Sequence, residues 1–243
     1  LAADYKSFSF SFRLGERVMW TDNAALSDKD ELTDIFSSTE LSLNYQLKIS
    51  SNTFGILSTS YSFYRYADHD ALDFDSLQVN WGVNHVFRGL DDLSTWIRYN
   101  YTRILSADDH SELFTNHSIE VGAYYPIPLG TNKAAYVAYA SEFSIDAAPS
   151  RSQRNDHGLT LGYNYAPLDN LKIDAYYRIA YQDYRERGRS DLLQSLEVSA
   201  TTKLTKGIDL VFTANYSLND SNLSGSDYKA GSVGALLALK IEF

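Results

Sequence analysis

The chain ends with Gly231-Ser-Val-Gly-Ala-Leu-Leu-Ala-Leu-Lys-Ile-Glu-Phe243. In an extended strand successive side chains point to opposite faces, so every second residue lines the same face. One face of this segment is wholly apolar, whereas the other mixes small residues with Lys240 and Glu242. A strand this long with such a division predicts a sheet that meets an apolar medium on one side and a polar space on the other.

The same alternation recurs along the whole sequence. Residues 39–49 oppose an apolar set (Leu41, Leu43, Tyr45, Leu47, Ile49) to a polar one (Glu40, Ser42, Asn44, Gln46, Lys48). We expect strands at 6–15, 39–49, 53–66, 76–87, 93–105, 115–125, 133–145, 157–166, 171–184, 192–204, 208–218 and 231–243. No segment shows the period of an amphipathic helix, so the pattern indicates an all-β chain.

Strand length and connection length point to one architecture. The expected strands are longer than those of most soluble domains and suit a tilted crossing of an apolar layer. Connections alternate between short turns and longer segments, the first of which is expected at residues 16–38. These features predict a single domain over residues 1–243, an antiparallel up-and-down transmembrane β-barrel of about twelve strands. An even strand number places both termini at the short-turn end.

Composition excludes several classes of protein. The chain has no cysteine, which rules out disulfides and thiolate metal sites. A net charge of −10 argues against nucleic-acid binding. A mean hydropathy of −0.31 and the lack of a long apolar run exclude a helical membrane protein. The first residues lack the pattern of a secretory signal, so we expect a mature or trimmed form.

A soluble β-sandwich is the alternative fold, because its half-buried strands also alternate. It explains the tyrosines less well, since many of the 19 lie near expected strand ends. Tyrosine at a membrane interface places its ring among acyl chains and its hydroxyl in water. We assign to this girdle Tyr64, Tyr66, Tyr99, Tyr101, Tyr139, Tyr165, Tyr177, Tyr181 and Tyr184.

The inward face carries charges of both signs. On the parity above, a lumen polar network would comprise Arg13, Glu40, Arg98, Glu120, Glu142, Arg178 and Glu197. Arg98 and Glu120 lie at mid-height on consecutive strands, where they could pair; Arg178 and Glu197 are placed similarly. Two interpretations remain open: a polar network that fills a narrow barrel, or charges that line a path for small solutes.

The expected loops differ in charge. The first contains Asp22, Asp28, Asp30, Glu31 and Asp34, which suggests either a solvated acidic loop or a divalent-cation site without EF-hand spacing. Two later loops on the same side are rich in arginine. Because guanidinium groups bind phosphate and carboxylate, these are candidate contacts for lipopolysaccharide or another anion: Arg151, Arg154, Arg185, Arg187 and Arg189.

Catalysis is not expected. Outer-membrane lipid hydrolases place a serine and a histidine on one face, but His117 and Ser118 are adjacent and therefore face opposite sides of a strand. The sequence also lacks a glycine-rich phosphate loop. We therefore assign no catalytic, cofactor or metal residues.

The terminal strand ending in Phe243 resembles the signature by which bacterial outer-membrane β-barrels are recognised for assembly. Residues 61–73 (Tyr-Ser-Phe-Tyr-Arg-Tyr-Ala-Asp-His-Asp-Ala-Leu-Asp) and 114–118 (Phe-Thr-Asn-His-Ser) are loosely similar to barrels associated with exopolysaccharide and surface-assembly systems. The resemblance implies location in the bacterial outer membrane with periplasmic termini. The implied partners are membrane lipid, lipopolysaccharide, the barrel assembly machinery and a surface or secretion complex.

Three functions follow as expectations. The first is a porin-like channel for small polar solutes, or a narrow and partly plugged pore. The second is a structural or partner-binding barrel of a surface polysaccharide or secretion assembly. A lipid-modifying outer-membrane enzyme is a minor alternative.

Overall fold

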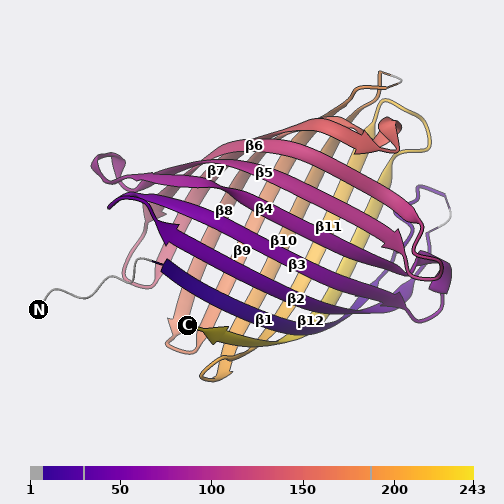
Figure 1. The fold of residues 1–243 in the computed structure, drawn as a ribbon. Coiled ribbons are helices and arrows are strands. Elements are labelled where there is room, and N and C mark those ends of the chain that lie inside the picture. Colours follow the sequence, from indigo (N-terminus) through magenta and orange to yellow (C-terminus); the bar gives the residue numbers. More distant parts are fainter. Residues whose placement is uncertain (1–7, 30, 187) are drawn as a thin grey trace, which may run out of the picture.

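A computed structural model describes residues 8–29, 31–186 and 188–243 and shows a closed antiparallel barrel (Figure 1). Every strand pairs with its sequence neighbours, and β1 closes the barrel on β12. The strands are β1 (Phe8–Thr21), β2 (Asp34–Lys48), β3 (Thr53–Tyr66), β4 (Phe74–Phe87), β5 (Leu93–Ser106), β6 (Glu112–Pro128), β7 (Lys133–Ala148), β8 (Arg154–Leu168), β9 (Leu171–Tyr184), β10 (Ser190–Thr205), β11 (Ile208–Ser221) and β12 (Tyr228–Glu242). The prediction of an all-β, twelve-stranded antiparallel barrel is confirmed.

Three single-turn 3₁₀ helices interrupt the connections: η1 (Asp70–Leu72), η2 (Arg88–Leu90) and η3 (Ser150–Ser152). Among the described residues, no helix is long and apolar enough to cross a membrane.

Several strands are longer than predicted, so the loops are shorter. The first loop covers residues 22–33 instead of 16–38, because Val18 and Trp20 continue the apolar face of β1 while Arg17 and Met19 face inward. The connections at 107–111 and 149–153 shrink for the same reason. The contrast between long loops and short turns is therefore weaker than the sequence suggested.

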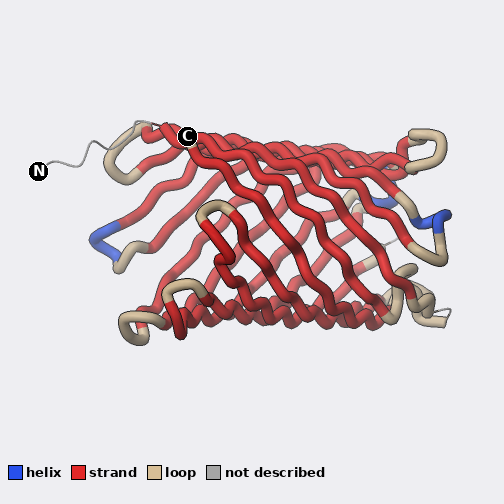
Figure 2. The backbone as a smooth tube through the Cα atoms, turned by 90° about the horizontal axis from the view of Figure 1, so that it is seen from below, coloured by secondary structure: helices blue, strands red, loops and turns tan. Residues whose placement is uncertain are grey.

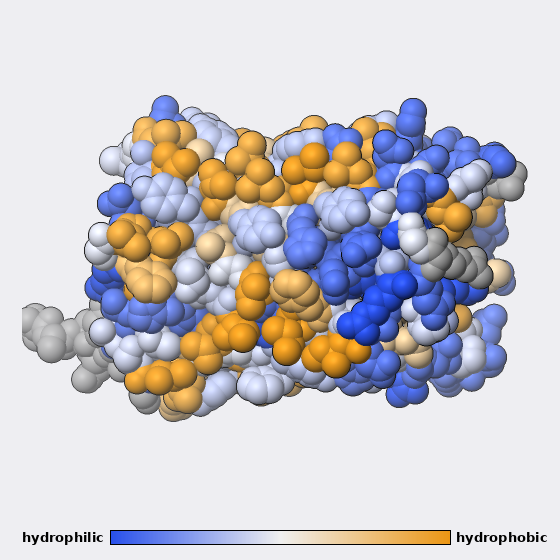
Figure 3. Space-filling view, turned by 90° about the horizontal axis from the view of Figure 1, so that it is seen from above, coloured by the Kyte–Doolittle hydropathy of each residue, from blue (hydrophilic) through white to orange (hydrophobic). Residues whose placement is uncertain are grey.

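The outer surface has an apolar band. Several large apolar side chains of this band are more than half exposed, for example Trp81 at 58%, Ile97 at 54% and Phe212 at 54%. Figure 3 shows hydrophobic side chains over the middle of the barrel and hydrophilic ones at the end that carries the loops. Such a band suits contact with acyl chains.

Three tyrosines assigned to the girdle face inward, and that assignment is wrong for them. Tyr64 and Tyr66 alternate with the outward Tyr61 and Phe63, and the Tyr64 ring stacks on Phe74 with centroids 4.3 Å apart. Tyr184 is only 8% exposed. Proximity to a strand end does not distinguish the two faces, whereas parity does.

The two ends of the barrel differ. The start of β1 at Phe8 and the C-terminus lie at the end with the turns 49–52, 88–92, 129–132, 169–170 and 206–207, as Figures 1 and 2 show. The first loop lies at the opposite end and is tied to β12: the Asn23 side-chain amide donates to the Lys229 carbonyl (2.8 Å). The backbone N–H of Gly231 donates to Asp22 Oδ1 (2.7 Å).

Candidate functional site: the lumen and its loop-end mouth

One wall of the lumen is built from small, uncharged polar side chains. Ser58 and Ser60 on β3, Gln78 and Asn80 on β4 and Asn100 on β5 all have the parity opposite to the exposed apolar residues. Gln78 is exposed although it faces inward. No side chain from the opposite wall therefore covers this position, and the lumen is water-accessible beside β4.

The short-turn end of the barrel is hollowed. A cavity of about 750 Å³ lies there, and its lining includes Ser11, Asn44, Gln46, Lys240 and Glu242. Asn44 and Gln46 are exposed although both point away from the lipid-facing side.

The neighbouring part of the wall, from β5 onward, carries charges, and Arg98 and Glu120 are central to it. These residues are register partners on β5 and β6, with Arg98 Nη1 3.7 Å from Glu120 Oε1. The Trp96 indole N–H donates to the same carboxylate. The Arg98 guanidinium lies over the Trp96 ring, 4.9 Å from its centroid. Glu120 thus has one hydrogen-bond donor and one ion-pair partner, both from β5.

Three carboxylates follow one another across adjacent strands. Glu120 is the register partner of Glu142, which is the partner of Asp156. Like charges at this spacing repel unless each is compensated. Each one has its own donor: Ser118 Oγ donates to Glu142 (2.5 Å), and Asp156 accepts from Arg178 (2.6 Å) and Gln182 (2.8 Å).

The partner of Arg178 differs from the sequence interpretation. Arg178 pairs with Asp156 on β8, whereas Glu197 on β10 accepts a hydrogen bond from the Tyr176 hydroxyl (3.0 Å). An acidic residue lies on each strand next to β9, Asp156 on β8 and Glu197 on β10. Only the strand register determines which of them pairs with Arg178. Arg13 and Glu40 lie on β1 and β2 with inward parity, and within the described residues neither forms an ion pair.

Sequence reasoning did not single out Trp96, Asp156 or Tyr176, although each contacts a candidate residue. Asp156 was placed in a loop because its strand was predicted to begin at residue 157. The inward parity of Trp96 and Tyr176 was the signal that could have identified them.

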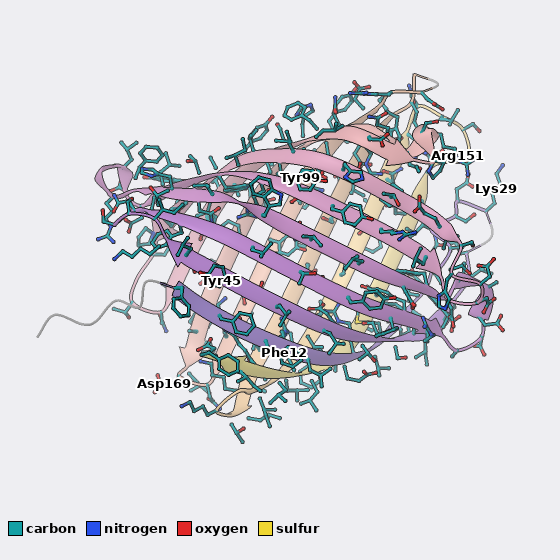
Figure 4. The ribbon with its side chains drawn as sticks, in the orientation of Figure 1. Phe12, Lys29, Tyr45, Tyr99, Arg151 and Asp169 are labelled. Atoms are coloured by element: carbon teal, nitrogen blue, oxygen red, sulfur yellow. The ribbon has the colours of Figure 1, made fainter. Side chains whose placement is uncertain are left out.

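Three of the five candidate arginines meet at the loop end. A cavity of about 310 Å³ is lined by Phe114, Arg151, Ser152, Arg154, Tyr184, Glu186, Arg189 and Leu223. Arg185 is not in this lining; its backbone N–H donates to the Gln153 carbonyl (3.0 Å) and joins the two arginine-bearing loops. Arg187 lies outside the described residues. Figure 4 shows Arg151 at the loop end and Asp169 at the opposite end.

The acidic residues of the first loop are used in several structural contacts. The carboxylate of Asp34 accepts from the Ile35, Ala67 and Asp68 backbone N–H groups and contacts His69 Nδ1 at 2.8 Å. Among the described residues, no group of three or more histidine, aspartate or glutamate side chains is arranged to hold a metal ion. Asp30 lies outside that part of the chain.

On the outer face, a serine of β7 contacts a histidine of β8. This hydroxyl–imidazole pair joins two neighbouring strands, whereas the sequence search considered pairs within one strand. Ser141 Oγ lies 2.9 Å from His157 Nδ1, and the same hydroxyl donates to the Tyr139 oxygen (2.8 Å). A nucleophile and base also need a group that orients the base. Within the described residues, no carboxylate is bonded to His157.

Comparison with known proteins shows the fold. No family model matches the chain, and the curated proteins contain no similar sequence. An outer membrane channel from Pseudomonas putida F1 superposes with a TM-score of 0.66 at 11% identity, covering 98% of this chain and 97% of that one. The chain has the fold of bacterial outer-membrane β-barrels.

Other solved barrels are similar to a lesser degree. The outer membrane channel DcaP of Acinetobacter baumannii gives a TM-score of 0.53 at 10% identity, covering 96% of this chain and 97% of that one. A bacterial polysaccharide outer membrane secretin gives 0.55 at 9% identity, covering 95% of this chain and 98% of that one. At these identities the likeness concerns architecture.

Proposed function

We propose that this chain is an outer-membrane channel for small polar solutes, with both termini in the periplasm and the loops outside. The proposal fits the combination of an apolar outer band with a polar lumen whose β3–β4 wall is uncharged and accessible. The similar folds of outer membrane channels support the same assignment. Lipid and lipopolysaccharide would surround the band, and the assembly machinery would insert the chain.

One observation carries the proposal: the lumen charges are compensated along the wall. Arg98 pairs with the neighbouring β6, Arg178 with the neighbouring β8, and Glu197 with the neighbouring β9. A barrel sealed by a polar network would need such contacts between opposite strands. Among the described residues, every lumen ion pair joins adjacent strands or residues two positions apart in the chain. The charges therefore leave the lumen unbridged.

Conductance in planar lipid bilayers tests the proposal. The wild-type barrel should show a steady open conductance. Asn80→Trp adds bulk to the accessible wall and should reduce it, whereas the neighbouring Val79→Trp faces lipid and should leave it unchanged. A wild-type barrel without conductance would contradict the proposal and favour the alternative of a partner-binding barrel in a surface or secretion assembly.

Catalysis is not part of the proposal. The contact between Ser141 and His157 has no orienting carboxylate within the described chain, and Tyr139 shares the serine hydroxyl.

A further inference from the structure

The arginine cavity at the loop end belongs to the lumen, not to the outer surface. Arg154 and Tyr184 are register partners at the loop ends of β8 and β9. Arg154 has the same parity as Asp156, and Tyr184 the same parity as Arg178 and Gln182, all of which meet in the lumen. The cavity is therefore part of the entrance through which a solute from outside would pass.

Two of the three arginines of this cavity, Arg154 and Arg189, are held in place before any ligand arrives. The Tyr184 ring holds two guanidinium groups, Arg189 at 4.2 Å and Arg154 at 5.4 Å from its centroid. Arg154 Nη1 also donates to the Tyr184 hydroxyl (3.0 Å). Gln153 anchors the η3 loop by donating its side-chain amide to the Ile145 carbonyl (2.8 Å).

The charges of the cavity are only partly compensated. Arg189 is bound by Asp191 through Nε (2.9 Å) and Nη2 (2.5 Å), and these hydrogen bonds raise the pKa of the Arg189 guanidinium. Arg151 and Arg154 form no ion pair within the described residues, and Glu186 is the one acid in the lining. Three cations thus face Glu186 and Asp191. An uncompensated positive charge remains, although the chain carries −10 overall.

We infer that this cavity binds the phosphate or carboxylate group of a small anionic solute between Arg151 and Arg154 at the channel entrance. Guanidinium groups held in place bind such groups with paired, charge-assisted hydrogen bonds. Tyr184 and Arg189 are positioning residues: Tyr184 orients Arg154, and Arg189 packs on the Tyr184 ring. The inference rests on the proposed channel function and names the class of solute that the entrance concentrates.

Calorimetric titration of the whole barrel in neutral detergent tests the inference. Inorganic phosphate and glucuronate should bind, whereas glucose should give no signal. The double variant Arg151→Ala/Arg154→Ala should weaken binding at least about tenfold, because each lost contact is a hydrogen bond to a charged group. Arg103→Ala is the matched control, since Arg103 lies on the outer face near the same end, paired with Glu112. It should bind like the wild type.

The possible outcomes distinguish a free anionic solute from the phosphate groups of lipopolysaccharide. They also test the entrance site separately from the channel function. In nanodiscs of neutral lipid phosphate binding should persist, and adding lipopolysaccharide should not compete with it. Competition by lipopolysaccharide, equal weakening by Arg103→Ala, or wild-type binding no stronger than that of glucose would overturn the inference. A barrel that conducts but binds no anion refutes the entrance site alone; one that binds anions but does not conduct refutes the channel.

Discussion

At the scale of single residues, neighbours in the chain have opposite surroundings. Leu43 is 40% exposed on the outer face, and Asn44 points into the lumen. An arginine at mid-height on the lipid face costs about 2–4 kcal/mol, so Leu43→Arg should destabilise the barrel by that amount in urea titrations in lipid vesicles. Asn44→Arg should be mild. Leu210→Arg should cost less than Leu43→Arg, because Leu210 is the third residue of β11 from the short-turn end.

Equal losses for Leu43→Arg and Asn44→Arg would mean that the assignment of the two faces is wrong.

The contact between Arg98 and Glu120 gives a second prediction at this scale. The pair is partly exposed, at 33% and 22% of the side chains, and the two atoms are 3.7 Å apart. We expect a double-mutant cycle with Arg98→Ala and Glu120→Ala to show a coupling of about 0.5–1 kcal/mol. Trp96 still donates to Glu120 when Arg98 is removed, which keeps the coupling small. Strictly additive losses of unfolding free energy would show that the two charges are independent.

At the scale of the strand, inward glycines make room for large side chains of the neighbouring strand. A Cβ at Gly122 on β6 would overlap the Trp96 ring on β5. Gly122→Ala should therefore displace Trp96, cost about 1–3 kcal/mol in urea unfolding and change the tryptophan fluorescence. Gly55→Ala is the control, because its Cβ would meet Ile49 Cδ1 at an ordinary 3.5 Å. If both alanine variants unfold alike, the ring does not lie on Gly122.

The strands also show which features the sequence could predict. β3 and β9 were predicted with the bounds found in the structure, because their alternation runs unbroken between turn residues. β1 was predicted to end at residue 15 but continues to Thr21, and it accommodates Glu16 and Arg17 because the barrel tolerates charges where a strand leaves the apolar layer. Alternation assigns each side chain to a face, but it does not set the register that gives Arg178 to Asp156.

The arginine-rich entrance was predicted only in part. Consecutive loops on one side suggested that the arginines lie close together, and Arg151, Arg154 and Arg189 do line one cavity. The role of Tyr184 depends on its parity and on its contacts with Arg154 and Arg189. No local pattern in the sequence contains that information.

At the scale of the whole molecule, the even number of strands puts the start of β1, the C-terminus and all five short turns at one end. The chain has no cysteine, so single cysteines can report which end faces outward. Asp108→Cys lies in the exposed loop 107–111, and Asp169→Cys lies in the turn between β8 and β9.

A membrane-impermeant maleimide added to intact cells should label Asp108→Cys but not Asp169→Cys. Both should react once the outer membrane is permeabilised, which controls for poor reactivity at the turn. The physical reason is that the short turns carry the least polar chain across the membrane during insertion, so the six polar loops remain outside. The arginine cavity would then meet solutes from the outside. Labelling of Asp169→Cys alone on intact cells would invert the barrel and place the arginine cavity on the periplasmic side.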